Sequence, residues 1–95
     1  MRLLNAGFGN LVAAERVVAL VNADAAPIRR MIQQAREENR AVDATAGRKT
    51  RAVLVLDSGH LLLSALQTET LAARLSEAGE AKNPRKPDSE SEGAT

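Results

Sequence analysis

The residues of this 95-residue chain with the clearest chemical potential are cations gathered in one short segment. Arg48, Lys49 and Arg51 fall within four positions, directly after Gly47. Three positive charges beside a glycine, which lets the backbone approach closely, suit phosphate binding, and an arginine can also fork onto a guanine edge. The alternative is a solvated turn beside a sheet edge, where cations discourage aggregation. An extended backbone would alternate these side chains between two faces, whereas a loop relaxes that alternation.

A second group, three arginines and one polar glutamine, recurs at helical spacing, four, three and four positions apart. Its members are Arg29, Gln33, Arg36 and Arg40. On a helix they fall on one flank, within roughly 60°. We expect the three arginines to be secondary phosphate contacts, or else part of an ordinary hydrated face that Glu37 and Glu38 neutralise locally. Arg16 stands apart at the head of an apolar segment, where it either caps a sheet edge or points at a partner.

Other chemistries lack the residues they need. The chain has no cysteine, and a single histidine, His60, cannot make a multi-histidine metal site. Asp57, Ser58 and His60 are the residue types of a catalytic triad, but they crowd one turn, where we expect their side chains to diverge. No apolar run approaches the roughly 18 residues of a membrane span. We therefore expect no catalytic residue, metal, cofactor, small-molecule substrate or membrane contact.

Charge and composition divide the chain near residue 76. Residues 1–76 hold ten Lys and Arg against seven Asp and Glu, a net charge of +3, whereas residues 77–95 carry −2. Residues 79–95 contain no Val, Ile, Leu or aromatic residue, so this segment cannot bury enough apolar area to offset the entropy of ordering it. We predict one folded domain over 1–76 and a disordered acidic tail over 77–95. Domains of this size are marginal alone, and oligomerisation is a common remedy.

The hydrophobic pattern predicts an α+β fold with a small, mostly antiparallel sheet, one main helix and a short C-terminal helix. Strands are expected over residues 2–5, 11–13, 16–21, 41–45, 51–56 and 61–66, with a tight turn over 7–10. The last two strands form a central hairpin around a two-residue turn at Ser58-Gly59.

The main helix is expected to begin near Asp24, as the N-cap residue, and to end near Asn39-Arg40. Its predicted buried stripe consists of Ile28, Met31, Ile32 and Ala35. The final helix covers residues 67–75, with Thr68 as its possible N-cap.

Five motifs in order resemble the RemA family, bacterial regulators of extracellular matrix genes. They are N-A-G-F-G-N (5–10), A-P-I-R-R-M-I (26–32), D-A-T-A-G-R-K-T-R-A-V (43–53), D-S-G-H (57–60) and S-A-L-Q-T-E-T (64–70). The resemblance covers roughly residues 1–76. It implies a DNA-binding transcriptional regulator with a fold akin to the LytTR DNA-binding domain. It also implies ring-like homo-oligomers that present many basic patches to wrapped DNA.

The resemblance carries DNA contact to Arg16, Arg48 and Lys49, with Arg51 as a fourth position. Two positions depart from the family pattern: Ala46 replaces an aromatic residue before the glycine, and Lys49 replaces an arginine. A lysine keeps the attraction for phosphate but lacks the planar fork that recognises a guanine edge.

The leading hypothesis is therefore a cytoplasmic, nucleoid-associated regulator of matrix and biofilm genes that binds double-stranded DNA as a homo-oligomer. The alternative is a protein-interaction or scaffolding module that does not bind nucleic acid. RNA binding is a weaker option, because single-stranded RNA readers stack bases on aromatic side chains and Phe8 is the only one here. The acidic tail could compete with DNA for the basic loop.

Overall fold

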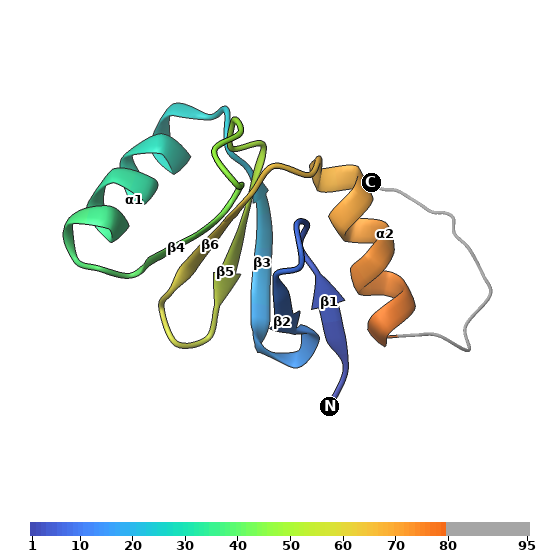
Figure 1. Cartoon of the computed structure of the whole chain (residues 1–95). Helices are drawn as coiled ribbons and strands as arrows, with labels where there is room; N and C mark the ends of the chain where they lie inside the picture. Colours follow the sequence, from blue (N-terminus) through green and yellow to red (C-terminus); the bar gives the residue numbers. More distant parts are fainter. Residues whose placement is uncertain (80–95) are drawn as a thin grey trace.

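The computed structural model describes residues 1–79, and within them two helices and six strands alternate in an α+β arrangement (Figure 1). The elements are β1 (Leu3–Asn5), β2 (Leu11–Ala13), the 3₁₀ turn η1 (Ala14–Arg16), β3 (Val17–Asn22), α1 (Ala26–Glu37), β4 (Ala41–Ala44), β5 (Ala52–Leu56), β6 (Leu61–Ser64) and α2 (Thr68–Gly79). The predicted fold class is confirmed. The arrangement is compatible with the LytTR-like fold that the family resemblance implies.

The strands form two sheets where one was predicted. β1 and β2 pair as a separate antiparallel hairpin, and the other four strands form a sheet in the order β3-β5-β6-β4. In that sheet β5 pairs antiparallel with both β3 and β6, and only β4 and β6 run parallel. The sheet is mostly antiparallel, and the β5–β6 hairpin lies at its centre, as predicted.

The turn of that central hairpin has three loop residues, not the predicted two. The Leu56 N–H donates to the His60 carbonyl over 3.0 Å, and the Gly59 N–H donates to the Leu56 carbonyl over 2.9 Å. Gly59 has a φ of 90°, and this left-handed residue ends the loop that Asp57 begins. A glycine at the third loop position is typical of three-residue hairpins.

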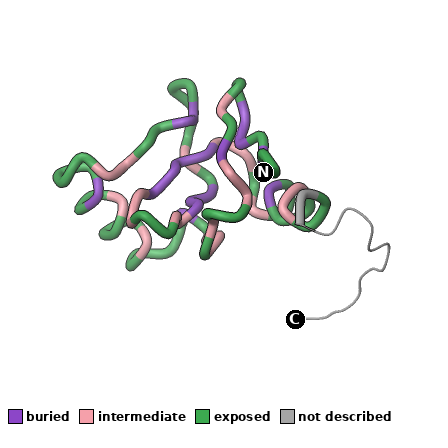
Figure 2. Tube along the Cα trace, turned by 90° about the horizontal axis from the view of Figure 1, so that it is seen from below, coloured by how far each residue is buried: buried purple, intermediate pink, exposed green. Residues whose placement is uncertain are grey.

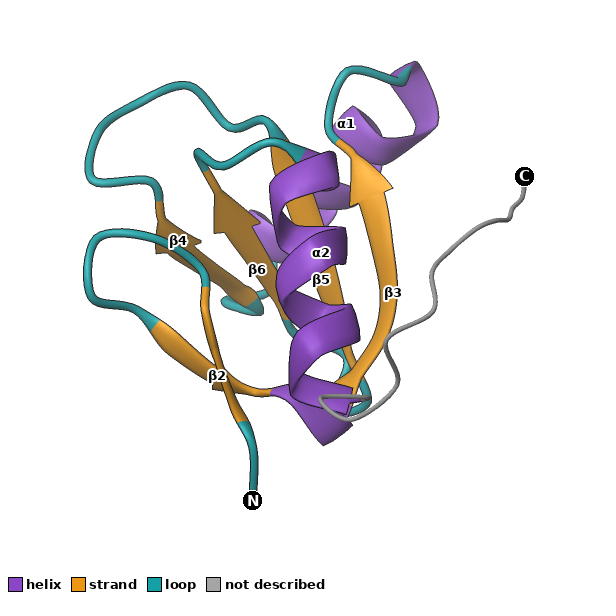
Figure 3. Ribbon diagram, turned by 90° about the vertical axis from the view of Figure 1, so that its right-hand side faces the viewer, coloured by secondary structure: helices purple, strands orange, loops and turns teal. Residues whose placement is uncertain are grey.

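The four-stranded sheet is covered on both faces. Side chains alternate along β5, so Leu54 faces the β1–β2 hairpin and α2, whereas Val53 and Val55 face α1. Leu4 of β1 and Leu71 of α2 are both buried and belong to the same core cluster as Leu54. Figure 3 looks onto α2 with the strands behind it, and Figure 2 shows the buried residues concentrated in the middle of the molecule.

Helix α1 begins one residue later than predicted. Its N-cap residue is Ala25, which offers no side-chain hydrogen bond, so the predicted cap at Asp24 is wrong. The Asn22 side chain closes this turn instead, by accepting the Asp24 N–H over 2.9 Å. Ala35 is buried against the sheet as expected, but Met31 is 39% exposed because it lies at the border of the packed face.

The same helix ends earlier than predicted, at Glu37. Asn39 adopts a left-handed φ of 59°, and the Arg40 N–H bonds back to the Ala35 carbonyl over 2.7 Å. This pattern is a Schellman motif, in which a left-handed residue satisfies the last carbonyls of the helix. Arg40 therefore lies beyond the helix, and its predicted place on the helical stripe is wrong.

The final helix extends further than the pattern predicted. Thr68 is its first residue and not its cap, and the N–H of Leu71 bonds to the carbonyl of Gln67 over 3.1 Å. The helix runs to Gly79, three residues past the predicted domain boundary at 76/77. The rest of the predicted acidic tail, residues 80–95, lies outside the described residues. Neither helix that the structure describes is long and apolar enough to cross a membrane.

Candidate nucleic-acid interface

The basic segment is the connection from β4 to β5, and the sheet order dictates its path. Because β6 lies between these two strands, residues 45–51 must pass across one end of β6. The gap between the two strands is two strand spacings, about 10 Å. The connection therefore lies at the end of the sheet where β3 finishes and α1 begins (Figure 1).

A tight turn presents the first cation of this segment. The Arg48 N–H donates to the Thr45 carbonyl over 3.0 Å, and the two residues between them, Ala46 and Gly47, have φ values of 54° and 82°. Two consecutive left-handed residues are characteristic of a type I′ turn. Asp43 anchors the turn by accepting the Thr45 N–H over 2.9 Å and its hydroxyl over 2.6 Å. These hydrogen bonds lower the pKa of the Asp43 carboxyl.

Arg48 lies against an aromatic ring that the sequence analysis did not connect with it. Its guanidinium carbon is 4.8 Å from the centre of the Phe8 ring, a cation–π geometry. Phe8 sits at the tip of the β1–β2 turn with a φ of 54° and is 52% exposed. The contact holds the arginine at the surface in a restricted orientation. No local pattern could have revealed it, since forty positions separate the two residues.

Lys49 borders a hollow between the basic loop and α1. The hollow has a volume of about 340 Å³, and Arg29 and Arg36 of α1 border it as well. Its remaining lining residues are Ala23, Asp24, Ile32 and Thr50. The structure thus brings together three cations that the sequence analysis had placed in two groups. Gln33, the polar member of the predicted stripe, bonds to Glu37 instead.

Arg51 has a fixed backbone and an exposed side chain. Its N–H donates to the Ser64 carbonyl over 2.8 Å, and its carbonyl accepts the Ala23 N–H over 3.1 Å. It borders a smaller hollow of about 70 Å³ that Asp24 and Glu69 also line. Two carboxylates beside this arginine make it a weaker anion contact than Lys49.

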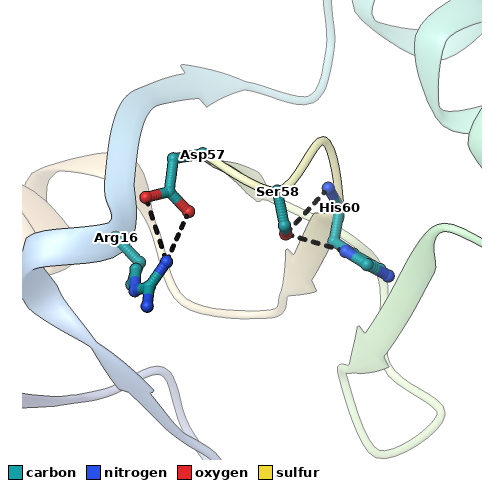
Figure 4. A network of polar contacts seen from close by, with 4 residues as sticks. All are labelled: Arg16, Asp57, Ser58 and His60. Carbon is teal, nitrogen blue, oxygen red and sulfur yellow. Dashed lines mark hydrogen bonds and ion pairs between the residues drawn. The ribbon is translucent and has the colours of Figure 1, made fainter.

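Arg16 lies at the opposite end of the sheet. Its guanidinium is 3.3 Å from the Asp57 carboxylate, and its carbonyl accepts the Asp57 N–H (Figure 4). Asp57 lies six positions after Arg51, about 20 Å along the strand β5 that connects them. Within one subunit the structure therefore does not bring Arg16 together with the basic loop.

Arg40 also belongs to this distant end. It donates to the Gly59 carbonyl and forms an ion pair with Glu38 at 2.7 Å. A hydrogen bond from Gln34, and to a smaller extent one from Arg40, lowers the pKa of the Glu38 carboxyl. The Arg40 side chain thus connects the end of α1 to the β5–β6 turn, and this contact stabilises the fold.

The triad residue types on the β5–β6 turn form no relay. Ser58 Oγ lies 2.8 Å from Nδ1 of His60, while the Asp57 carboxylate faces Arg16 on the other side of the turn (Figure 4). A relay needs the acid on the histidine nitrogen that Ser58 already occupies. Among residues 1–79, no group of three His, Cys, Asp or Glu side chains could hold a metal ion.

Comparison with known proteins gives this surface a family context. A family model described as RemA-like, extracellular matrix regulatory protein A-like, matches residues 3–75. The chain belongs to this RemA-like family. The match spans both helices' sheet-facing residues and every cation considered above, and it confirms the resemblance that the motifs indicated.

Similar proteins occur in several bacteria. A protein of Synechococcus elongatus is 62% identical over 73 residues, covering 77% of this chain and 84% of its own length. One of Dictyoglomus turgidum is 59% identical over 75 residues, covering 79% and 88%. One of Bacillus cytotoxicus is 57% identical over 75 residues, covering 79% and 86%. Each carries the name "Putative regulatory protein", which together with the family description supports a regulatory role.

Proposed function

We propose that this RemA-like protein is a DNA-binding transcriptional regulator that acts as a ring-like homo-oligomer and controls extracellular matrix and biofilm genes. The observation that carries the proposal is the group of cations around the β4–β5 loop. Arg48, Lys49 and the two arginines of α1 lie at one end of the sheet. Among residues 1–79, none of these four forms an ion pair.

Unpaired cations on one face favour a polyanion over a compact acidic partner. Each phosphate that a lysine or arginine neutralises releases condensed counterions from the duplex, which drives binding in dilute salt. Arg48, held over Phe8, is presented in a restricted orientation, so it loses less side-chain entropy on contact. Lys49 contributes a compact charge that attracts phosphate without a base-reading fork.

Repetition of the patch compensates for the small number of contacts in one subunit. Three or four phosphate contacts bind weakly at physiological salt, but in a ring each later contact is effectively intramolecular. The outer strands of the sheet, β3 and β4, carry exposed Val18 and Val42, 62% and 43% exposed. Exposed edge strands with apolar side chains favour association with further chains. Arg16, at the other end of each sheet, would then add a separate row of contacts.

The double variant R48A/K49A tests the proposal. We expect it to lose most of its affinity for a duplex in a gel-shift assay, with the salt slope of binding reduced by about 2 per subunit contacting DNA. The matched control R2A/R30A removes two exposed charges elsewhere and should bind nearly as the parent does. Light scattering should show the same oligomer for all three proteins. Unchanged binding by R48A/K49A would refute the assignment of these residues.

The alternative, a protein-interaction module that ignores nucleic acid, gives a different result. Such a module would show no duplex binding even at low ionic strength, where the electrostatic contribution is largest. A single salt titration of the full chain therefore separates the two functions.

A further inference from the structure

The hollow between α1 and the basic loop is lined by three cations and by one carboxylate, that of Asp24. Arg29 and Arg36 lie two helical turns apart on α1, and Lys49 reaches the same hollow from the loop. Among residues 1–79, no carboxylate lies within ion-pair distance of any of the three. Like charges held around one space repel each other, so an anion that enters between them is strongly favoured.

The hollow also has an apolar wall, which a DNA phosphate does not need. Ile32 lies between the two arginines, one turn from each, and Ala23 adds to the same lining. Its volume of about 340 Å³ falls within the range of small-molecule sites. The hollow is an open depression and does not exclude duplex phosphates, but its apolar wall suits a compact ligand that has an apolar portion.

Two polar side chains that line the hollow, Asp24 and Thr50, add possible hydrogen-bond partners for a ligand. The Asp24 carboxylate repels phosphate but accepts hydrogen bonds from sugar hydroxyls or an exocyclic amine, and the Thr50 hydroxyl can donate or accept. A ligand that combines phosphates, hydroxyls and a flat apolar ring uses all of these groups. The residue types of the sequence indicated no small-molecule substrate, and the two halves of this lining lie on separate segments.

We propose that this hollow binds a nucleoside phosphate, with the phosphates on Arg29, Arg36 and Lys49 and the base against Ile32. The site stands independently of DNA binding. One consequence rests on the proposed function: Arg29, Arg36 and Lys49 belong to both surfaces, so a bound nucleotide would neutralise DNA contacts and weaken the DNA complex.

Calorimetric titration of the full chain with ADP tests the site. We expect saturable binding, weakened about tenfold or more in R29A, because a charge-assisted phosphate contact is lost. R30A is the matched control, since it removes the same charge from the next position of the same helix and Arg30 does not line the hollow. The proposal is overturned if ADP shows no saturable binding, or if R30A weakens it as much as R29A.

Titration with pyrophosphate separates the phosphate from the nucleoside. We expect ADP to bind more tightly than pyrophosphate, and I32A to weaken only ADP. Equal affinities that I32A leaves unchanged would overturn the nucleoside assignment. Gel shifts on the same proteins keep the two proposals apart. DNA binding without ADP binding refutes only the nucleotide site, and ADP binding without DNA binding refutes only the DNA-binding function.

Discussion

The two ends of the four-stranded sheet hold arginines in opposite electrostatic states. At the end formed by the β5–β6 turn, Arg16 pairs with Asp57, and Arg40 is bonded to Glu38 and to a backbone carbonyl. At the end formed by the β4–β5 loop, the cations have no ion pair among residues 1–79. They are Arg29, Arg36, Arg48 and Lys49.

This difference shows why net charge is a poor guide to a binding face. The charge of an arginine that is bonded to a carboxylate and a carbonyl is already neutralised within the molecule. Substitution of such an arginine therefore lowers the stability of the fold. A cation with no internal partner contributes little to folding and leaves its field available to an external anion. By this criterion we propose the β4–β5 loop end as the functional face and the hairpin end as mainly structural.

Substitution of Arg40 is expected to give the largest difference in stability between the two ends of the sheet. We expect R40A to lower the free energy of unfolding by about 1–2 kcal/mol, because the Gly59 carbonyl and Glu38 both lose a charged donor. K49A should change stability by no more than about 0.5 kcal/mol. Urea unfolding measures both variants. Equal destabilisation by the two substitutions would contradict the distinction between the ends, as would a loss of DNA binding in R40A alone.

A smaller effect concerns Arg16, whose pairing with Asp57 is exposed. D57N should change the unfolding free energy by less than about 0.5 kcal/mol, since surface ion pairs contribute little. It should raise duplex affinity about twofold, because the charge of Arg16 is no longer offset. Fluorescence anisotropy with a labelled duplex measures this change, and R16A/D57N is the control that should cancel the gain. A weaker duplex complex in D57N would place Arg16 among the purely structural residues.

The smallest effect is a pH dependence at the basic loop. Because hydrogen bonds from Thr45 lower the pKa of Asp43, the ionised carboxylate stabilises the folded state. This contribution is fully present above the ordinary carboxyl value of 3.8 and is lost as the pH falls through the lower folded pKa. Between pH 5 and pH 3 the urea midpoint of T45V should therefore fall less than that of the parent. Parallel curves for the two proteins would contradict this role of Asp43.

Much of the fold was predictable because it rests on local patterns. Two short apolar runs that could not both be exposed identified β5 and β6 as central strands, and Gly59 marked their turn. The errors fall at element ends. Helix α1 ends before Asn39 because Asn39 adopts a left-handed conformation, which asparagine tolerates; the helical spacing of Arg40 had suggested a longer helix.

The candidate site was predictable only in part. The glycine and the adjacent cations located the loop, and the helical spacing located the arginines of α1. That Lys49 and Arg36 share one hollow while Arg16 lies at the far end of the sheet was not predictable, since it depends on strand order. The Phe8–Arg48 contact was missed for the same reason.

The amino-acid sequence alone determined the family, the types of the elements and the positions of the cations along the chain, because each depends on residue identity and short spacing. The tertiary structure alone decided which cations are neutralised and which are free. β4 pairs with β6 and not with β5, so the connecting loop must cross the end of the sheet and meet α1 there. The effect of a surface charge depends on its distance from the neighbouring charges. Tertiary packing sets that distance when the charges lie on segments that are remote in the sequence.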